Sequence, residues 1–164
     1  MSINLNGIKT TIQSILNTAN TTTASPTDLS VGLEDRIKEV MTVNPDLIPI
    51  DTSRLPAVTI WIDSKSVIPD TIAATQLAAK RKAKVRFKIA GAVFRSLITD
   101  YRTDLADDEA AILMENIEEI LRGNPNLSGT VSWQFPSDIN YYTRTQEETM
   151  YRVGIMDLDA VVHY

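Results

Sequence analysis

The feature that most constrains the fold is the strictly alternating segment at residues 82–89, which reads KAKVRFKI. Only a β-strand places such basic and apolar sets on opposite faces, whereas a helix would mix them around its circumference. We therefore predict a long strand with one face against a core. The apolar face would comprise Ala83, Val85, Phe87 and Ile89, and the basic face Lys82, Lys84, Arg86 and Lys88.

Length and composition favour one domain. The 164 residues can bury a core without a disulfide or metal, and the absence of cysteine excludes disulfides and thiolate sites. No N-terminal run is typical of a signal peptide, and no apolar stretch approaches the ~20 residues of a membrane helix, so we expect a soluble, cytoplasmically made protein. The net charge of −5 argues against a general nucleic-acid binder, although basic residues cluster at 80–88.

Two segments near the N-terminus have apolar residues at helical spacing. Residues 8–16 predict an amphipathic helix, with Asn4 or Asn6 as its cap. The polar stretch at 17–27 predicts a loop or flexible connector, because it has little apolar area to bury. A second, short helix is predicted at 33–41.

The clearest helix signal lies at Asp104–Arg122. Acidic residues, including Glu109, crowd its start near the positive end of the helix dipole, and Gly123 and Pro125 follow its end. Its buried stripe would comprise Ala110, Leu113, Ile117, Ile120 and Leu121.

Three further strands are predicted. Pro56 opens the first, where its missing N–H does least harm. The second carries three apolar residues on one face, Val131, Trp133 and Phe135. The third runs from about Thr149 to Tyr164, and a change of apolar phase predicts a bulge or bend near 156–157. Hairpin-like connections favour one α+β domain over residues 1–164, with a mainly antiparallel sheet of about four strands and helices packed on one face.

A long connection at 64–79 separates the first of these strands from the basic strand. Loops beyond ~12–15 residues are uncommon in compact domains and are usually functional or disordered. Two interpretations stand side by side: a local helix at 71–79 that covers its own domain, or an intersubunit arm. The contact residues of such an arm would be Val67, Ile68, Ile72 and Leu77.

No residue pattern indicates catalysis. The one histidine, His163, lies beside the chain's end, a poor place to hold an imidazole in fixed geometry. Asp157 and Asp159 could share a strand face and hold a hard cation, but with no third ligand evident, a solvated face or charge pairs with the basic strand are favoured. We therefore expect no enzyme, no cofactor and no metal site.

The basic face is the sharpest candidate for a functional surface. Its charges would span ~20 Å and could follow a phosphate backbone or meet an acidic partner. A solvated face, which also keeps the strand from promiscuous pairing, is the alternative. Direct base reading is not expected, because no aromatic residue interleaves with the charges. Tyr141 and Tyr142 could form a separate exposed contact patch.

With these elements placed, the chain resembles the tail terminator, or tail completion, proteins of long-tailed bacteriophages. The resemblance covers most of the chain and rests on the order of an N-terminal helix, LPAVTIWID, KAKVRFKIAG, a helix and ETMYRVGIMDLDAVVHY. The segment ILRGNPNLSGTVSW carries it furthest, because this family similarly joins a helix to the next strand through a short turn with Pro, Leu and Gly.

The resemblance implies a structural virion protein that forms a ring, usually a hexamer, at the head-proximal end of the tail. Such a ring stops polymerisation of the tube, caps the sheath in contractile tails and presents the head-docking surface, while DNA passes through its lumen. The implied partners are further copies of the chain, the tail tube protein, the sheath protein and a head-closure or neck protein, with no membrane. Its implied location is the virion, after assembly in the host cytoplasm.

Two other readings of the sequence stay open. Other neck or head-closure proteins share similar folds and sizes, and a small nucleic-acid-binding module could use the basic strand at 80–88. Phosphate contacts would make affinity fall steeply with ionic strength, whereas the ring interpretation predicts a defined oligomer with weak nucleic-acid affinity.

Overall fold

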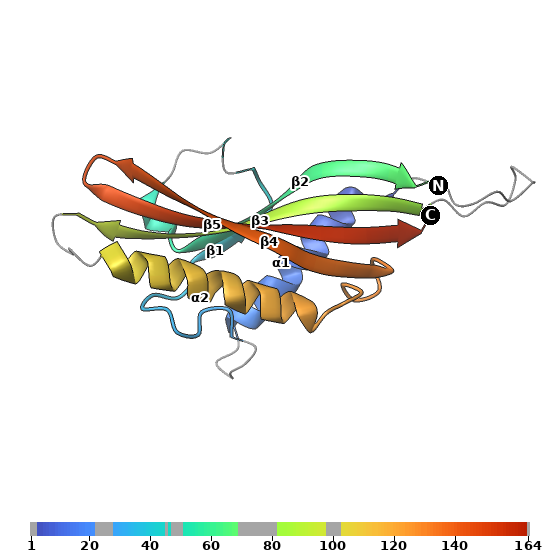
Figure 1. Cartoon of the computed structure of the whole chain (residues 1–164). Coiled ribbons are helices and arrows are strands. Elements are labelled where there is room, and N and C mark those ends of the chain that lie inside the picture. The colour runs from blue at the N-terminus through green and yellow to red at the C-terminus, as the bar shows by residue number, and fades with distance from the viewer. Residues whose placement is uncertain are drawn as a thin grey trace, which may run out of the picture.

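The computed structural model describes residues 3–21, 28–44, 46, 51–68, 82–97 and 103–163. In chain order its elements are α1 (Leu5–Thr21), β1 (Glu39–Met41), the 3-10 helix η2 (Thr52–Arg54), β2 (Ala57–Ile68), β3 (Lys82–Ser96), α2 (Thr103–Arg122), β4 (Trp133–Gln146) and β5 (Thr149–His163). The strands form one sheet in the order β1-β2-β3-β5-β4, and α1 and α2 pack against it (Figure 1).

This architecture confirms the α+β class with a mainly antiparallel sheet and helices packed on it. The sheet has five strands rather than four, because β1 adds a short strand parallel to β2. No helix in the described part of the chain is long and apolar enough to cross a membrane.

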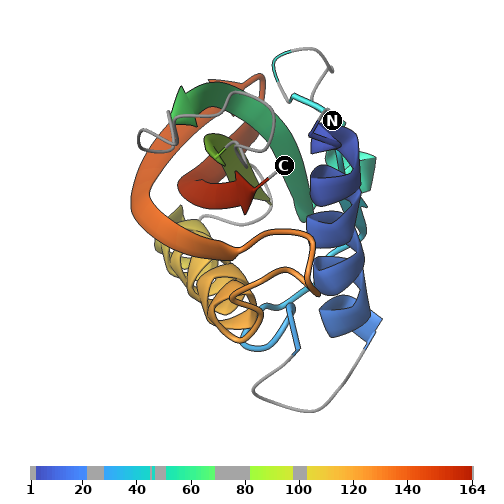
Figure 2. The same cartoon turned by 90° about the vertical axis from the view of Figure 1, so that its right-hand side faces the viewer.

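The alternating segment is confirmed as part of β3, the central strand. Its four predicted core residues are 0% exposed, and its basic residues lie on the other side of the sheet. β3 pairs with β5 in one unbroken antiparallel register, from Lys82 opposite His163 to Ser96 opposite Thr149. The long strands twist and curve strongly rather than lying flat (Figure 2).

The short helix predicted at 33–41 is wrong. Glu39–Met41 instead form β1, parallel to the start of β2. Val40 is buried, as helical spacing also required, but its neighbours find backbone partners across the sheet: the Lys38 N–H donates to the Pro56 carbonyl oxygen at 2.8 Å. Pairing with a distant strand therefore outweighs local spacing.

The N-terminal helix is confirmed and is longer than predicted. Asn4 caps it by accepting a backbone N–H of the first turn at 2.8 Å. The helix continues to Thr21, so part of the predicted connector at 17–27 is helical, and Asn20 donates its side-chain amide to a carbonyl oxygen just before β1. Residues 22–27 lie outside the described chain.

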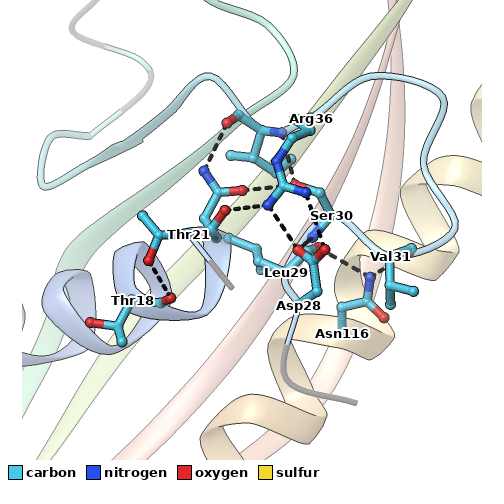
Figure 3. Close-up of polar contacts among 10 residues, drawn as sticks. Thr18, Thr21, Asp28, Leu29, Ser30, Val31, Arg36 and Asn116 are labelled. Carbon is cyan, nitrogen blue, oxygen red and sulfur yellow. Dashed lines mark hydrogen bonds and ion pairs between the residues drawn. The ribbon is translucent and has the colours of Figure 1, made fainter. Parts of the chain in front are cut away.

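A polar network ties the chain after α1 to both helices (Figure 3). The Asp28 carboxylate accepts the Ser30 N–H at 3.0 Å and pairs with the Arg36 guanidinium at 3.1 Å. Asn116 of α2 donates to two carbonyl oxygens of the same turn, at 3.1 and 2.9 Å. Burial raises the pKa of Asp28, but the Ser30 N–H and Arg36 outweigh it, and the resulting pKa lies below the ordinary value.

Acid should weaken this network. Because the pKa of Asp28 is lower in the folded protein than its ordinary value of 3.8, the stability that its carboxylate provides is complete above that pH and is lost as pH falls through the folded-state pKa. Urea titrations at a series of acidic pH values should show a smaller loss of unfolding free energy for Asp28→Asn than for the wild type. Asp138→Asn, at an exposed carboxylate, is the control. The same acid sensitivity in Asp28→Asn and the wild type would contradict this role.

Helix α2 has the predicted end and lies close to the sheet because two glycines face it. Gly91 of β3 and Gly154 of β5 are register partners near the middle of the sheet. A Cβ at Gly154 would lie 2.4 Å from Met114 Cγ, and one at Gly91 would lie 2.7 Å from Leu113 Cδ2. Both α2 side chains are fully buried, so they occupy the space that the glycines leave.

Gly154→Ala should destabilise the protein by about 1–3 kcal/mol, the usual effect of overpacking a core. Gly91→Ala should have a smaller effect, because Leu113 Cδ2 is the free end of its side chain and can shift. Gly123→Ala is the control, since its new Cβ would meet the Ile120 carbonyl oxygen at 3.4 Å, an ordinary contact. Urea denaturation measures all three variants, and wild-type stability in Gly154→Ala would refute the close packing of α2.

The bulge predicted near 156–157 is not in β5, whose register with β3 is unbroken. The irregularity lies in β4 instead, between Pro136 and Ile139. The apolar phase of β5 changes because Val153 and Ile155 belong to the face away from the helices, which is also apolar at that end of the sheet.

The predicted apolar face at 131–135 is also wrong. Val131 is buried but precedes β4, whereas Trp133 and Phe135 are 46% and 54% exposed. The buried positions of this part of β4 are Gln134 and Pro136, because the register with β5 turns the aromatic side chains away from the helices.

Glu109, interpreted as a helix-start charge, is buried instead. It is 4% exposed, pairs with Arg95 of β3 and accepts the Glu34 N–H at 2.8 Å. The carboxylate therefore joins α2 to β3 and to the chain before β1, a long-range role that its position in the sequence does not reveal.

Candidate assembly surface

The candidate surface is the face of the sheet opposite the helices, which we call the outer face. It carries the even-numbered residues of β3 and the odd-numbered residues of β5, which are register partners. The four predicted basic residues, Lys82, Lys84, Arg86 and Lys88, lie on it and are partly exposed. The outer face is charged along the first half of β3 and apolar beyond Lys88.

In the charged half, Asp159 of β5 binds two of the predicted basic residues. Its carboxylate accepts from Arg86 Nε and Nη2 at 2.8 and 3.0 Å, and Lys84 Nζ lies 2.8 Å from Oδ2. The hydrogen bond from Arg86, with help from Lys84, outweighs burial and holds the pKa of Asp159 below its ordinary value. Pairing with Asp159 in turn raises the pKa of Arg86.

Two further ion pairs extend this set, which we call the ion ladder. Arg86 Nη1 lies 3.3 Å from Asp157, and Lys88 Nζ lies 3.4 Å from Asp63. Lys82 makes no ion pair within the described residues. The two aspartates of β5 therefore form charge pairs with the basic strand, which was one of the alternatives open from the sequence. The basic row is neutralised along most of its length.

The apolar half of the outer face contains a cavity of about 290 Å³, which we call the hollow. Its floor consists mainly of small side chains of β2 and β3, namely Ala57, Thr59, Ala90 and Ala92. Larger apolar side chains stand around the floor, namely Met41, Leu55, Tyr142, Tyr151, Val153 and Ile155. The hollow exists because small residues on two neighbouring strands lie beside large ones.

Charged residues surround the hollow. Arg54 binds Glu39 through two hydrogen bonds of 2.8 Å, so its charge is balanced. Asp46, Asp51 and Arg144 of β4 also line the hollow. Hydrogen bonds from the Ser53 side chain and N–H hold the pKa of Asp51 below its ordinary value.

Both edges of the sheet carry exposed apolar side chains. Strand β4 pairs with β5 on one side only, among the residues described. On the opposite edge, β1 covers only Ala57–Thr59, which leaves Ile60–Ile68 without a described neighbour on that side. On these two edge strands the large apolar residues that are 37–56% exposed are Trp133, Phe135, Tyr141 and Tyr142 on β4, and Val67 and Ile68 on β2.

The predicted arm begins later than the sequence indicated. Ser64–Ile68 continue β2 and pair with β3, so the boundary at residue 64 is wrong. These residues resemble a loop in sequence because an exposed edge strand needs no apolar face. Val67 and Ile68 are exposed at the end of β2, whereas Ile72, Leu77 and the alternative helix at 71–79 lie outside the described chain.

The outer face also carries the chain's one histidine. His163 is exposed at the end of β5, opposite Lys82. Over the ranges that the structure describes, no group of three or more His, Asp or Glu could hold a metal ion. What the outer face offers is ion pairs, exposed aromatic rings and an apolar hollow, the kinds of group that protein interfaces use.

Sequence reasoning missed the hollow, although one signal pointed to it. The outward phase of β3 is basic up to Lys88 and then changes to Ala90 and Ala92. Small apolar residues in an outward phase indicate either a covered face or a depression. The walls come from distant parts of the chain, which no local pattern connects.

Comparison of the sequence with protein-family models and with curated proteins finds no match.

Asp159→Lys should destabilise the protein by about 1–2 kcal/mol, because a third cation would replace the partner of Lys84 and Arg86 in a partly buried site. Adding Arg86→Glu should recover much of this loss by restoring an ion pair of the opposite sense. The control is Asp138→Lys, an exposed position on β4. Urea denaturation of the four proteins tests the ladder, and equal stability of Asp159→Lys and Asp138→Lys would show that the ladder contributes nothing.

Proposed function

We propose that this protein is a structural virion component of the tail-terminator kind. It forms a ring at the head-proximal end of a phage tail, stops polymerisation of the tail tube and, in a contractile tail, of the sheath, and provides the surface to which the head docks. The order helix, strand, long strand, helix, strand, strand supports the proposal, because the resemblance rests on that order.

The observation that carries the proposal is the pair of unlike, exposed sheet edges. The β4 edge presents Trp133 and Phe135, and the β2 edge presents Val67 and Ile68. Contacts between two different surfaces of one chain are heterologous, and they generate a ring whenever the rotation between neighbours closes. Aromatic residues exposed on a scaffold of this kind are typical of protein contacts.

The ion ladder argues against the nucleic-acid-binding alternative. A phosphate backbone would have to compete with Asp157 and Asp159 for Lys84 and Arg86, which already have partners. The net charge of −5 also disfavours binding to a nucleic acid, which is a polyanion. Another neck or head-closure role uses the same surfaces and differs only in the partner, so binding to tail tube protein distinguishes it.

As concentration rises, the purified protein should change from monomer to one closed oligomer of defined mass, with a hexamer as the expected size. Light scattering gives the mass and negative-stain images show whether the particles are rings. Added to polymerising tail tube protein, the ring should shorten the tubes and appear at one end of each. Open filaments, or tubes of unchanged length, would contradict the proposal.

The nucleic-acid alternative has a separate control. Affinity for duplex DNA, measured by fluorescence anisotropy between about 50 and 200 mM salt, should be weak at both ends of this range. Tight binding that weakens steeply with salt, in a protein that stays monomeric, would favour the nucleic-acid module instead.

A further inference from the structure

The hollow on the outer face has no aromatic side chain on its floor, and an exposed tryptophan lies at the other end of the same face. We propose that the hollow is the docking site for Trp133 of a second copy of this chain, in a head-to-tail contact that repeats around the ring. The inference rests on the proposed ring and specifies its subunit contact.

Trp133 cannot fill the hollow of its own subunit. Its register partner on β5 is Val161, whereas the residues of β5 that line the hollow are Tyr151, Val153 and Ile155, of which Ile155 is the nearest, six positions along the strand. At ~3.3 Å per residue this separation is about 20 Å. The side chain that enters the hollow must therefore come from another molecule.

The hollow is suited to an aromatic side chain. Its volume of about 290 Å³ and its floor of alanine side chains leave room for a flat ring, and Tyr142 and Tyr151 stand beside it. Tryptophan is one of the residues in which interface hot spots are enriched, and such residues typically fill well-packed pockets. Trp133 is 46% exposed, and Phe135, its neighbour on the same strand face, is 54% exposed. The partner that fits the hollow is thus present on the chain itself.

Thr59 supplies a polar group that favours tryptophan. The residue is 8% exposed, lines the hollow, and its Oγ1 has no hydrogen-bond partner among the described residues. Rotation about its Cα–Cβ bond exchanges hydroxyl and methyl, and so brings the oxygen toward the hollow. There it can accept the indole N–H of Trp133, which a buried tryptophan needs to satisfy.

Charges around the two surfaces are complementary. Val161, the register partner of Trp133, also pairs with Lys84 of β3. Lys82 lies two residues before Lys84 on the same face and makes no ion pair within the described part. Among the residues that line the hollow, Asp46 and Asp51 outnumber Arg144 once Arg54 is paired with Glu39, so the lining carries a net negative charge. Opposite charges at the rim of a contact steer association more than they add affinity, so the contact should form more slowly at high salt.

Two variants divide the contact into its halves. Trp133→Ala removes the inserted side chain, and Ala92→Phe fills the hollow from within the same chain. Each variant alone should associate at least about 30-fold more weakly than the wild type, as expected for a hot-spot residue. Mixed together they should form a 1:1 dimer and nothing larger, because only one combination of intact surfaces remains. Val31→Ala, at an exposed apolar position beside α2 on the helix side of the sheet, is the control. Circular dichroism checks that each variant folds.

The hydroxyl of Thr59 has its own test. Thr59→Val keeps the shape of the floor and should weaken association by about 3- to 10-fold, and the same change in a Trp133→Phe background should have no further effect. This pattern separates a direct hydrogen bond from a general loss of packing.

The outcomes separate the contact from the ring. Rings formed equally well by Trp133→Ala and the wild type would overturn the docking of Trp133 and leave the ring standing. A wild type that stops at a two-fold dimer would overturn the head-to-tail contact and the ring together. A wild type that stays monomeric up to its solubility limit would do the same.

Discussion

The pairing of β3 with β5 is the constraint on which the rest of the structure depends. Both strands are 15 residues long and share one register, so each residue of one strand has a fixed neighbour on the other. On the face toward the helices this register places Gly91 beside Gly154, which lets α2 approach the sheet. On the outer face it places Arg86 beside Asp159. A shift of one residue would turn the basic row into the core, so core packing and the ion ladder specify the same register.

Elements with a strong local period were predictable, and elements defined by distant partners were not. The alternation around Phe87 requires a strand, and the stripe and stop signals of Asp104–Arg122 require a helix, whatever else the chain does. Val40 would be buried in either a helix or a strand. It lies in a strand because the backbone of residues 39–41 pairs with that of β2, which local sequence does not reveal. At Ser64–Ile68 the strand has no apolar face to reveal it, because the edge is exposed on both sides.

The candidate surface likewise has parts that the local pattern predicted and parts that depend on distant partners. The sequence predicted which face Lys84 and Arg86 occupy, since period two determines the face, but it left open whether they are free or paired. Pairing depends on the register that aligns them with Asp159, and Glu109 likewise becomes a partner of Arg95 only through the fold. The hollow combines residues of all five strands and of η2 and was not predicted for that reason.

A neutralised charge row next to an apolar hollow is consistent with the proposed assembly of free monomers into a ring. The ion ladder keeps polar groups on half of the outer face with most of their charges paired, and the hollow is small, so the proposed head-to-tail contact would be weak on its own. Closing such a ring would strengthen the contacts, because the last contact forms between the two ends of one assembly. The effective concentration of its two contact surfaces is then high. Weak contacts that become strong only on closure favour monomers and complete rings over open chains, which is the property that the proposed role at the end of a tail tube requires.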